Sequence, residues 1–200
     1  MDFSARSTAI VLYLATVAAT ATAQPGRLSR PRGGIEIGMA APSLLVSDAS
    51  GPQLHLGFAP VIGGIAAWPL GPRLKSMLAL RASAAVLRGS QGNAEWDAGR
   101  SSQIALQIGL EQSLGARFGV SLAVGPTWLF GPADVTPFRA ASSALHWGGS
   151  GGASWRVSQK RPIAATLAVD GFMIGGSSLN DPIAEPAWVR RVVVGVRYGG

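Results

Sequence analysis

The chain has 200 residues, with 17 Lys and Arg against 10 Asp and Glu, and it contains no cysteine. The lack of cysteine excludes a disulfide framework, a cysteine-ligated metal site and a lipidated cysteine anchor, and the length fits one domain. The net charge of +7 leaves nucleic acid, anionic lipid and acidic polysaccharide as electrostatically suitable partners.

Residues 1–23 have the features of a secretory signal peptide. A short segment ends in Arg6, an uncharged and mostly apolar run follows at 9–19, and small residues at 21–23 suit cleavage. An anchor that stays attached is the alternative, although the apolar run is short for a spanning helix. We therefore expect an exported protein in which 24–32 form a short basic periplasmic tail. Export makes nucleic acid an unsuitable partner, and we expect none.

The rest of the chain, 33–200, is predicted to form one barrel domain of β-strands. Apolar residues lie at every second position, as in SSQIALQIGLEQSL, where Ile104 and Ile108 alternate with Ala105 and Gln107. Eight segments show this alternation over about the length of a tilted membrane-spanning strand: 34–45, 55–68, 75–87, 101–114, 117–129, 145–157, 162–174 and 188–198. In the second segment the apolar face carries Leu56, Phe58, Ile62 and Trp68.

Two alternatives concern single segments. The Gly-rich HWGGSGGASW in the sixth segment could be a flexible linker, but Trp147 and Trp155 share one face with the apolar residues around them, which favours a strand. The uncharged LGFAPVIGGIAAWPLGP, from Leu56, could suggest a membrane-spanning helix, but its Gly and Pro residues disfavour a helical bundle.

Short and long connections alternate between the predicted strands. LGPR, LGAR and SQKR predict tight turns, whereas VSDASGPQ, RGSQGNAEWDAGRS, FGPADVTPFRAASS and GGSSLNDPIAEPA predict longer loops. This alternation is typical of a barrel with short periplasmic turns and long exterior loops.

The positions of the aromatic residues indicate that the apolar face is turned to lipid. Trp and Tyr concentrate at membrane–water interfaces. The aromatic residues near the strand ends share the apolar face and predict two interfacial girdles: Trp68, Trp155, Tyr198 and Phe118 at the short turns, and Trp128, Trp147 and Trp188 at the long loops. A soluble barrel whose aromatics lie at its edges by chance is the alternative.

The opposite face consists mainly of small and polar residues, which we expect to fill a narrow lumen. Charges that face inward must be paired, because a lone buried ion is unfavourable. Antiparallel geometry predicts three structural pairs: Glu36 with Arg197, Asp170 with Arg191, and Arg81 with Glu111.

With these features the chain resembles the small outer-membrane β-barrels of OmpA/OmpX type. The resemblance rests on the signal peptide, the eight strands, the girdles and the last strand, VVVGVRY, where Val194, Val196 and Tyr198 resemble the C-terminal signal that the barrel-assembly machinery reads. Family members often end on the aromatic residue, whereas Gly199 and Gly200 follow here. The resemblance implies an eight-stranded antiparallel up-and-down transmembrane β-barrel in a Gram-negative outer membrane, in contact with its lipids.

We expect a structural, adhesion or surface-interaction role, with an unidentified extracellular ligand possible at the four long loops. A narrow porin-like solute pore, a lipid A-modifying enzyme and a soluble lipocalin-like carrier are the alternatives. We expect no catalytic site, cofactor or metal, since neither His55 nor His146 has ligand spacing around it. His146 is the one suggestive base, but similar deacylases carry a serine two residues later, where Gly148 stands.

Overall fold

The computed structural model of the chain describes residues 30–46, 53–132, 144–158, 160–174 and 187–199. The predicted signal peptide, residues 24–29 of the predicted tail and most of three predicted long loops lie outside the described residues. No helix in the described part of the chain is long and apolar enough to cross a membrane.

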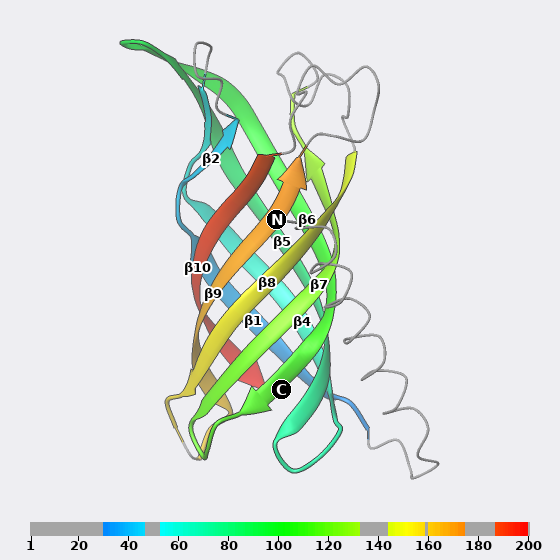
Figure 1. Cartoon of the computed structure of the whole chain (residues 1–200). Coiled ribbons are helices and arrows are strands. Elements are labelled where there is room, and N and C mark those ends of the chain that lie inside the picture. Colours follow the sequence, from blue (N-terminus) through cyan, green and yellow to red (C-terminus); the bar gives the residue numbers. More distant parts are fainter. Residues whose placement is uncertain (1–29, 47–52, 133–143, 159, 175–186, 200) are drawn as a thin grey trace, which may run out of the picture.

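The described residues form strands that curve into a closed barrel (Figure 1). The strands are β1 (Arg32–Ala40), β2 (Ser43–Val46), β3 (Gln53–Leu56), β4 (Ala59–Pro69), β5 (Leu74–Gln91), β6 (Ala94–Ser113), β7 (Phe118–Phe130), β8 (Ala144–Arg156), β9 (Ile163–Ile174) and β10 (Ala187–Gly199). A ring of 8 antiparallel strands, β1 and β4 to β10, closes where β1 pairs with β10. The predicted fold, an eight-stranded up-and-down barrel, is confirmed.

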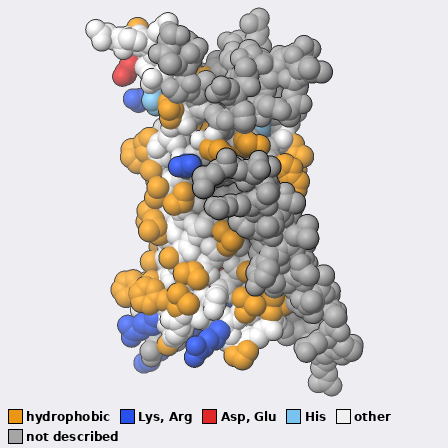
Figure 2. All heavy atoms as spheres, viewed as in Figure 1, with side chains coloured by type: hydrophobic (Ala, Val, Ile, Leu, Met, Phe, Trp, Pro, Cys, Tyr) orange, Lys and Arg blue, Asp and Glu red, His pale blue; other side chains and the backbone are white. Residues whose placement is uncertain are grey.

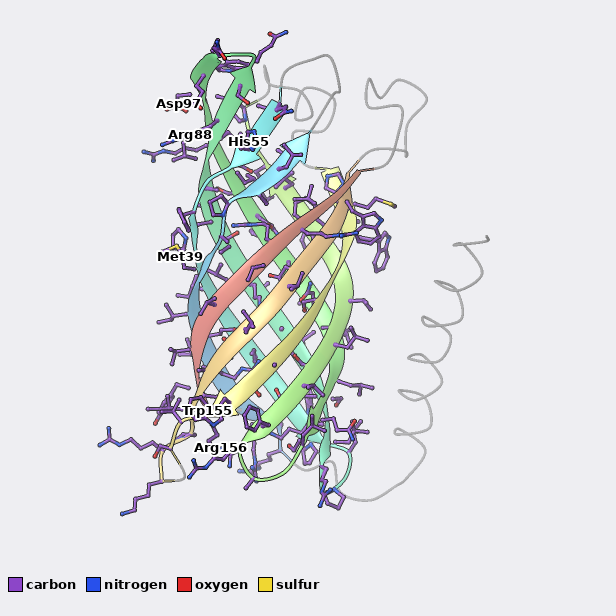
Figure 3. The ribbon with its side chains drawn as sticks, turned by 60° about the vertical axis from the view of Figure 1, so that its left-hand side comes forward. Met39, His55, Arg88, Asp97, Trp155 and Arg156 are labelled. Carbon is purple, nitrogen blue, oxygen red and sulfur yellow. The ribbon has the colours of Figure 1, made fainter. Side chains whose placement is uncertain are left out.

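The exposure of alternate side chains shows which face of the barrel is turned outward. Ile35 and Ile37 are 57% and 62% exposed, whereas Glu36 between them is 1% exposed. Exposed apolar side chains cover the wall in the view of Figure 2, and Met39 points away from the barrel in Figure 3. A soluble monomer rarely exposes so large an apolar surface, whereas an apolar outer band around a polar interior is typical of a membrane barrel. The apolar face is therefore the lipid face.

The first two predicted strands are each interrupted. The segment 34–45 divides into β1 and β2, and the segment 55–68 divides into β3 and β4. Across the second break Leu56 is buried, Phe58 is exposed and Ala59 is buried, so inward positions are even-numbered before the break and odd-numbered after it. Because the side-chain period of a strand is two, this shift moves Leu56 into the barrel. The prediction that placed Leu56 on the lipid face is wrong.

The three connections predicted to be short, 70–73, 114–117 and the described part of 158–161, lie together at one end of the barrel (Figure 1). We call this the short-turn end. Gly115 in the second of these turns has a φ of +98°, which favours glycine. The first turn is closed by a hydrogen bond from the amide of Leu70 to the carbonyl of Leu74.

At the opposite end, one predicted long loop is instead an extended hairpin. β5 continues to Gln91 and β6 begins at Ala94, so only Gly92 and Asn93 form the turn. Gly92 has a φ of +58°, as a two-residue hairpin with glycine at its first central position requires. The predicted loop is wrong here because backbone pairing between β5 and β6 stabilises a polar segment whose composition is typical of a loop. The hairpin projects beyond the ring in Figure 1, and Arg88 and Asp97 mark it in Figure 3.

The aromatic residues predicted to form girdles lie at two levels of the wall. Near the short-turn end, the rings of Phe118 and Trp155 stack with centroids 6.4 Å apart, and Trp155 lies at that end in Figure 3. Tyr198 lies on the same level because it pairs with Ile163, at the start of β9. The other members are Trp68 at the end of β4, and Trp128, Trp147 and Trp188 toward the opposite end.

Candidate functional site

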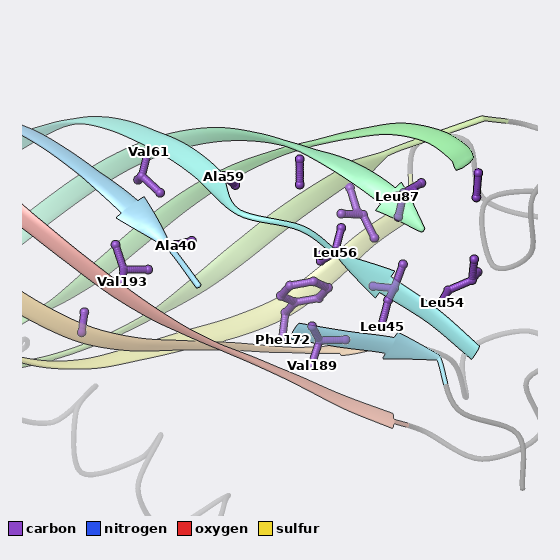
Figure 4. Packing of buried hydrophobic residues seen from close by; sticks show 14 residues of the cluster. Ala40, Leu45, Leu54, Leu56, Ala59, Val61, Leu87, Phe172, Val189 and Val193 are labelled. Atoms are coloured by element: carbon purple, nitrogen blue, oxygen red, sulfur yellow. The ribbon is translucent and has the colours of Figure 1, made fainter. Parts of the chain in front are cut away.

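The interior of the barrel is the candidate site, and its content changes from one end to the other. Toward the projecting hairpin the lumen is filled by buried apolar side chains, which we call the apolar cluster (Figure 4). The members come from every strand except β8: Ala40, Leu45, Leu54, Leu56, Ala59, Val61, Ala85, Leu87, Ala98, Leu129, Ala168, Phe172, Val189 and Val193.

The apolar cluster corrects the expectation of a lumen lined throughout by small and polar residues. Phe172 is its largest fully buried side chain, at 1% exposure. The break before β4 turns Leu56 inward, and the short hairpin of β2 and β3 brings in Leu45 and Leu54. These residues occur where the alternation of the predicted strands is interrupted. A prediction that keeps the same inward positions along the whole segment therefore does not place them inside the barrel.

A charged layer, defined by Glu36, Arg81, Asp170 and Arg191, lies next to the apolar cluster. Arg81 binds Glu36 Oε2 through Nη2 at 2.9 Å and Asp170 Oδ1 through Nη1 at 3.1 Å. Arg81 Nε also donates to Glu36 Oε2 at 3.1 Å, so the contact with Glu36 involves two nitrogens. Thr166 Oγ1 donates to Glu36 Oε1 at 3.0 Å. Both carboxylate oxygens of Glu36 therefore have partners inside the barrel.

Arg191 is held by neutral groups of the opposite wall. Its Nη1 donates to Gln103 Oε1 at 2.9 Å and to Ser83 Oγ at 3.2 Å. The space left between these residues and the Arg81–Asp170 pair has a volume of about 10 Å³, which corresponds to about one water molecule. The lumen is therefore filled at this level.

The six predicted pairing residues all lie within the barrel, but their partners differ from those predicted. Glu36 is the direct cross-strand neighbour of Arg197, and Asp170 that of Arg191, as antiparallel geometry suggested. The side chains nevertheless pair elsewhere: Glu36 and Asp170 share Arg81, while Arg197 binds Glu111. Long arginine side chains in a narrow lumen reach groups across it, and cross-strand register alone does not determine which.

Two glycines leave the space through which Arg81 and Thr166 contact Glu36. Gly63 lies between Glu36 and Arg81 in the same row of paired residues, and a Cβ placed there would be 3.0 Å from Cγ of Arg81. A Cβ at Gly195 would likewise be 3.0 Å from Oγ1 of Thr166. The missing side chains leave the space over which Arg81 and Thr166 extend toward Glu36.

At the short-turn end the lumen opens into a cavity of about 440 Å³, which we call the vestibule. Glu111 binds Arg197 Nη1 and lies 3.7 Å from Lys75 Nζ, both at the inner side of the vestibule. The charged residues that line the vestibule are Arg73, Lys75, Glu111, Arg117, Arg156 and Arg197.

His146 lies on β8, half-buried, with its ring 6.3 Å from that of Phe172. Ser150, the nearest serine on the same face of the strand, donates its hydroxyl to Gln107 Oε1 at 2.9 Å. Within the described ranges, no group of three or more His, Cys, Asp or Glu residues could hold a metal ion.

The sequence-based prediction placed small and polar residues in the lumen but did not identify the neutral hydrogen-bond partners among them. Thr166, Gln103, Gln107 and Ser83 complete the hydrogen bonds of the lumen, and their inward parity was the available signal. The vestibule arginines also left a signal, because all three short turns, LGPR, LGAR and SQKR, end in arginine.

Comparison with known proteins identifies the fold. No family model matches the chain, and no curated protein sequence matches it. Among solved structures, the attachment invasion locus protein Ail of Yersinia pestis, in complex with the heparin analogue sucrose octasulfate, aligns with a TM-score of 0.51 and 9% identity over 86% of this chain and 100% of Ail.

Two further solved structures align with lower scores. OprG of Pseudomonas aeruginosa has a TM-score of 0.47 and 11% identity over 86% of this chain and 97% of OprG. Neisserial surface protein A has a TM-score of 0.48 and 11% identity over 83% of this chain and 96% of its own. By its closed ring, its apolar wall and its alignment with Ail, the chain has the fold of the small eight-stranded outer-membrane β-barrels.

Proposed function

We propose that this protein is a plugged outer-membrane barrel with a structural and surface-interaction role, and that it does not conduct solutes. The observation that carries the proposal is the double closure of the lumen by the apolar cluster and, next to it, the charged layer. A solute pore needs a continuous water path, and the cavity within the charged layer has a volume of only about 10 Å³. In this proposal the six predicted pairing residues serve to fill and rigidify the interior.

Three features support a Gram-negative outer membrane as the location. The predicted signal peptide directs export, and the short turns suit the periplasmic side. Val194, Val196 and Tyr198 are exposed on the lipid face of β10, where the barrel-assembly machinery would read the last strand. The domain limits 1–23, 24–32 and 33–200 belong to this proposal.

The end opposite the short turns is the proposed surface for an extracellular ligand. The β5–β6 hairpin projects there and carries Arg88 and Arg100 together with Glu95 and Asp97. Ail has been solved with a heparin analogue, but the balanced charges of this hairpin offer no excess of positive charge for a sulfated ligand. The hairpin better suits a polar protein surface with charges of both signs.

A lipid-modifying activity has less support. General-base catalysis by His146 would need a nucleophile within hydrogen-bonding reach. The hydroxyl of Ser150 is already donated to Gln107, and position 148 is glycine. We therefore retain a non-enzymatic role.

The decisive experiment combines folding and conductance. The mature chain is folded into detergent and compared, boiled and unboiled, on a denaturing gel, and is then inserted into planar lipid bilayers. We expect a compact unboiled form that shifts on boiling, and no stepwise ion conductance. Stable conductance steps from the heat-modifiable form would establish the pore instead, and a monomer that stays folded without detergent would overturn the membrane location.

A further inference from the structure

Positive charge gathers around the short-turn end of the barrel. Figure 2 shows Lys and Arg side chains there, below the apolar wall, and Arg156 marks this end in Figure 3. The vestibule lies within this charge and is lined by Arg73, Lys75, Arg117, Arg156 and Arg197 against one carboxylate, Glu111. We propose that the vestibule is a binding site for a small phosphate-bearing anion with more than one negative charge.

The charges inside the vestibule do not balance without a ligand. Glu111 is shared by Lys75 and Arg197. Among the residues that the structure describes, no ion pair involves the other three vestibule arginines: Arg73, Arg117 and Arg156. Like charges around a concave surface concentrate a positive potential, which a multivalent anion would neutralise.

Arg197 supplies a second, independent observation. Its side chain is 8% exposed and lines the inner side of the vestibule. Its Nη1 donates to Glu111, whereas its Nε is buried and has no hydrogen-bond partner within the described part of the chain. Buried polar atoms in native proteins are normally paired, so Glu111 alone does not satisfy the hydrogen-bonding capacity of this guanidinium group.

The chemistry and size of the site favour phosphate. Guanidinium groups bind phosphate oxygens through planar, bidentate hydrogen bonds, and Ser113 and Ser154 add hydroxyls to the lining. A volume of about 440 Å³ lies in the range of small-molecule sites. Because the charged layer and the apolar cluster close the lumen beyond it, a ligand would enter and leave through the short-turn end alone. The vestibule would thus hold an anion without transporting it.

Titration calorimetry with inorganic pyrophosphate tests the site. The barrel is folded into phosphatidylcholine bilayer discs and compared with the double variant R117Q/R156Q. Both side chains are exposed at the rim, so the variant should fold. We expect saturable binding by the parent, and a Kd at least about tenfold higher in the variant, because charge-assisted hydrogen bonds to phosphate are lost.

The control variant, R88Q/R100Q, removes the same charge from the opposite end of the barrel. It should bind pyrophosphate as the parent does. An absence of saturable binding by the parent, or an equal loss of affinity in both variants, would overturn the site. The second outcome would show that only net charge matters.

Discs that contain phosphatidylglycerol identify the source of the phosphate. A higher apparent Kd for pyrophosphate in these discs than in discs given the same negative charge by oleic acid, which has no phosphate, would mean that lipid headgroups occupy the vestibule, and an equal Kd would mean a soluble anion. Both outcomes retain the phosphate site and differ only in the natural ligand.

Discussion

The two ends of the lumen are enclosed by the same ring of strands and nevertheless have opposite chemistry. At one end the inward positions carry Leu56, Leu87 and Phe172 and form a close-packed core. At the other end they carry Lys75, Glu111 and surrounding arginines, and leave a cavity of about 440 Å³. The outer wall stays apolar beside both ends.

This difference shows that the membrane constrains the residues at outward positions, whereas the residues at inward positions are free to differ. Lipid requires apolar side chains at outward positions and backbone groups that are paired within the protein, and the ring provides an apolar outer face and antiparallel pairing between neighbouring strands. It places no such demand on the inward positions. One half of the interior can therefore act as the stabilising core, while the other is free to hold charges for binding. The following predictions test this division by unfolding the barrel with urea in lipid vesicles.

The largest effect is expected in the apolar cluster. Phe172→Ala should lower the free energy of unfolding by about 3–5 kcal/mol, because it removes a fully buried aromatic side chain and leaves a cavity. Met173→Ala changes the adjacent, lipid-facing position and should have a much smaller effect. Equal losses in the two variants would mean that the cluster is not a core.

The charged layer should be the next most sensitive. Glu36→Gln removes one of the two carboxylates bound to Arg81 and should lower the free energy of unfolding by about 3 kcal/mol, the lower end for a broken buried pair, since Asp170 remains. The double variant E36Q/D170N removes both carboxylates, leaves the buried Arg81 without a counter-ion and should be less stable than E36Q. A double variant as stable as E36Q would contradict this account of Arg81.

The space above Gly63 gives a smaller and more local test. A Cβ there would be 2.9 Å from the carbonyl oxygen of Leu80 and 3.0 Å from Cγ of Arg81. Gly63→Ala should therefore destabilise the barrel by about 1–3 kcal/mol. The neighbouring Gly64 faces outward, and a Cβ there would have nothing within 4 Å, so Gly64→Ala should change the stability by less than about 0.5 kcal/mol.

The smallest effect concerns the wall. Phe118→Leu and Trp155→Leu, alone and combined, should show a coupling energy of about 0.5–1.5 kcal/mol, because the two rings stack at 6.4 Å. Trp147, toward the opposite end, serves as the control partner, and Phe118→Leu with Trp147→Leu should be additive. Additivity of the first pair would show that the stacked rings contribute separately to the wall.

The ring itself was predictable because a strand in a membrane barrel has a simple rule. Alternation with a period of two, as in Ile104 to Glu111, divides the side chains into two faces without knowledge of the neighbouring strands, and the aromatic residues then indicate that the apolar face is turned to lipid. The short turns were predictable for a similar reason, since local residues such as Gly115 specify them. The β5–β6 hairpin was not, because its polar strands are stabilised by each other rather than by a local apolar pattern.

The interior was predictable in part. Inward parity identified Glu36, Arg81, Asp170 and the other charged residues of the lumen, and antiparallel register brought Glu36 beside Arg197. Which of these charged residues form ion pairs with each other was not predictable, because the pairing depends on side chains that reach across the lumen and on the space left by Gly63 and Gly195.

The sequence by itself determined which residues of the uninterrupted strands face lipid and which face the lumen, since that choice is made one strand at a time. Only the tertiary structure decided that Leu56 joins a core, that Arg81 joins Glu36 to Asp170, and that arginines of separate turns surround one cavity. Each of these outcomes depends on closure of the barrel, which brings together residues that are far apart along the chain.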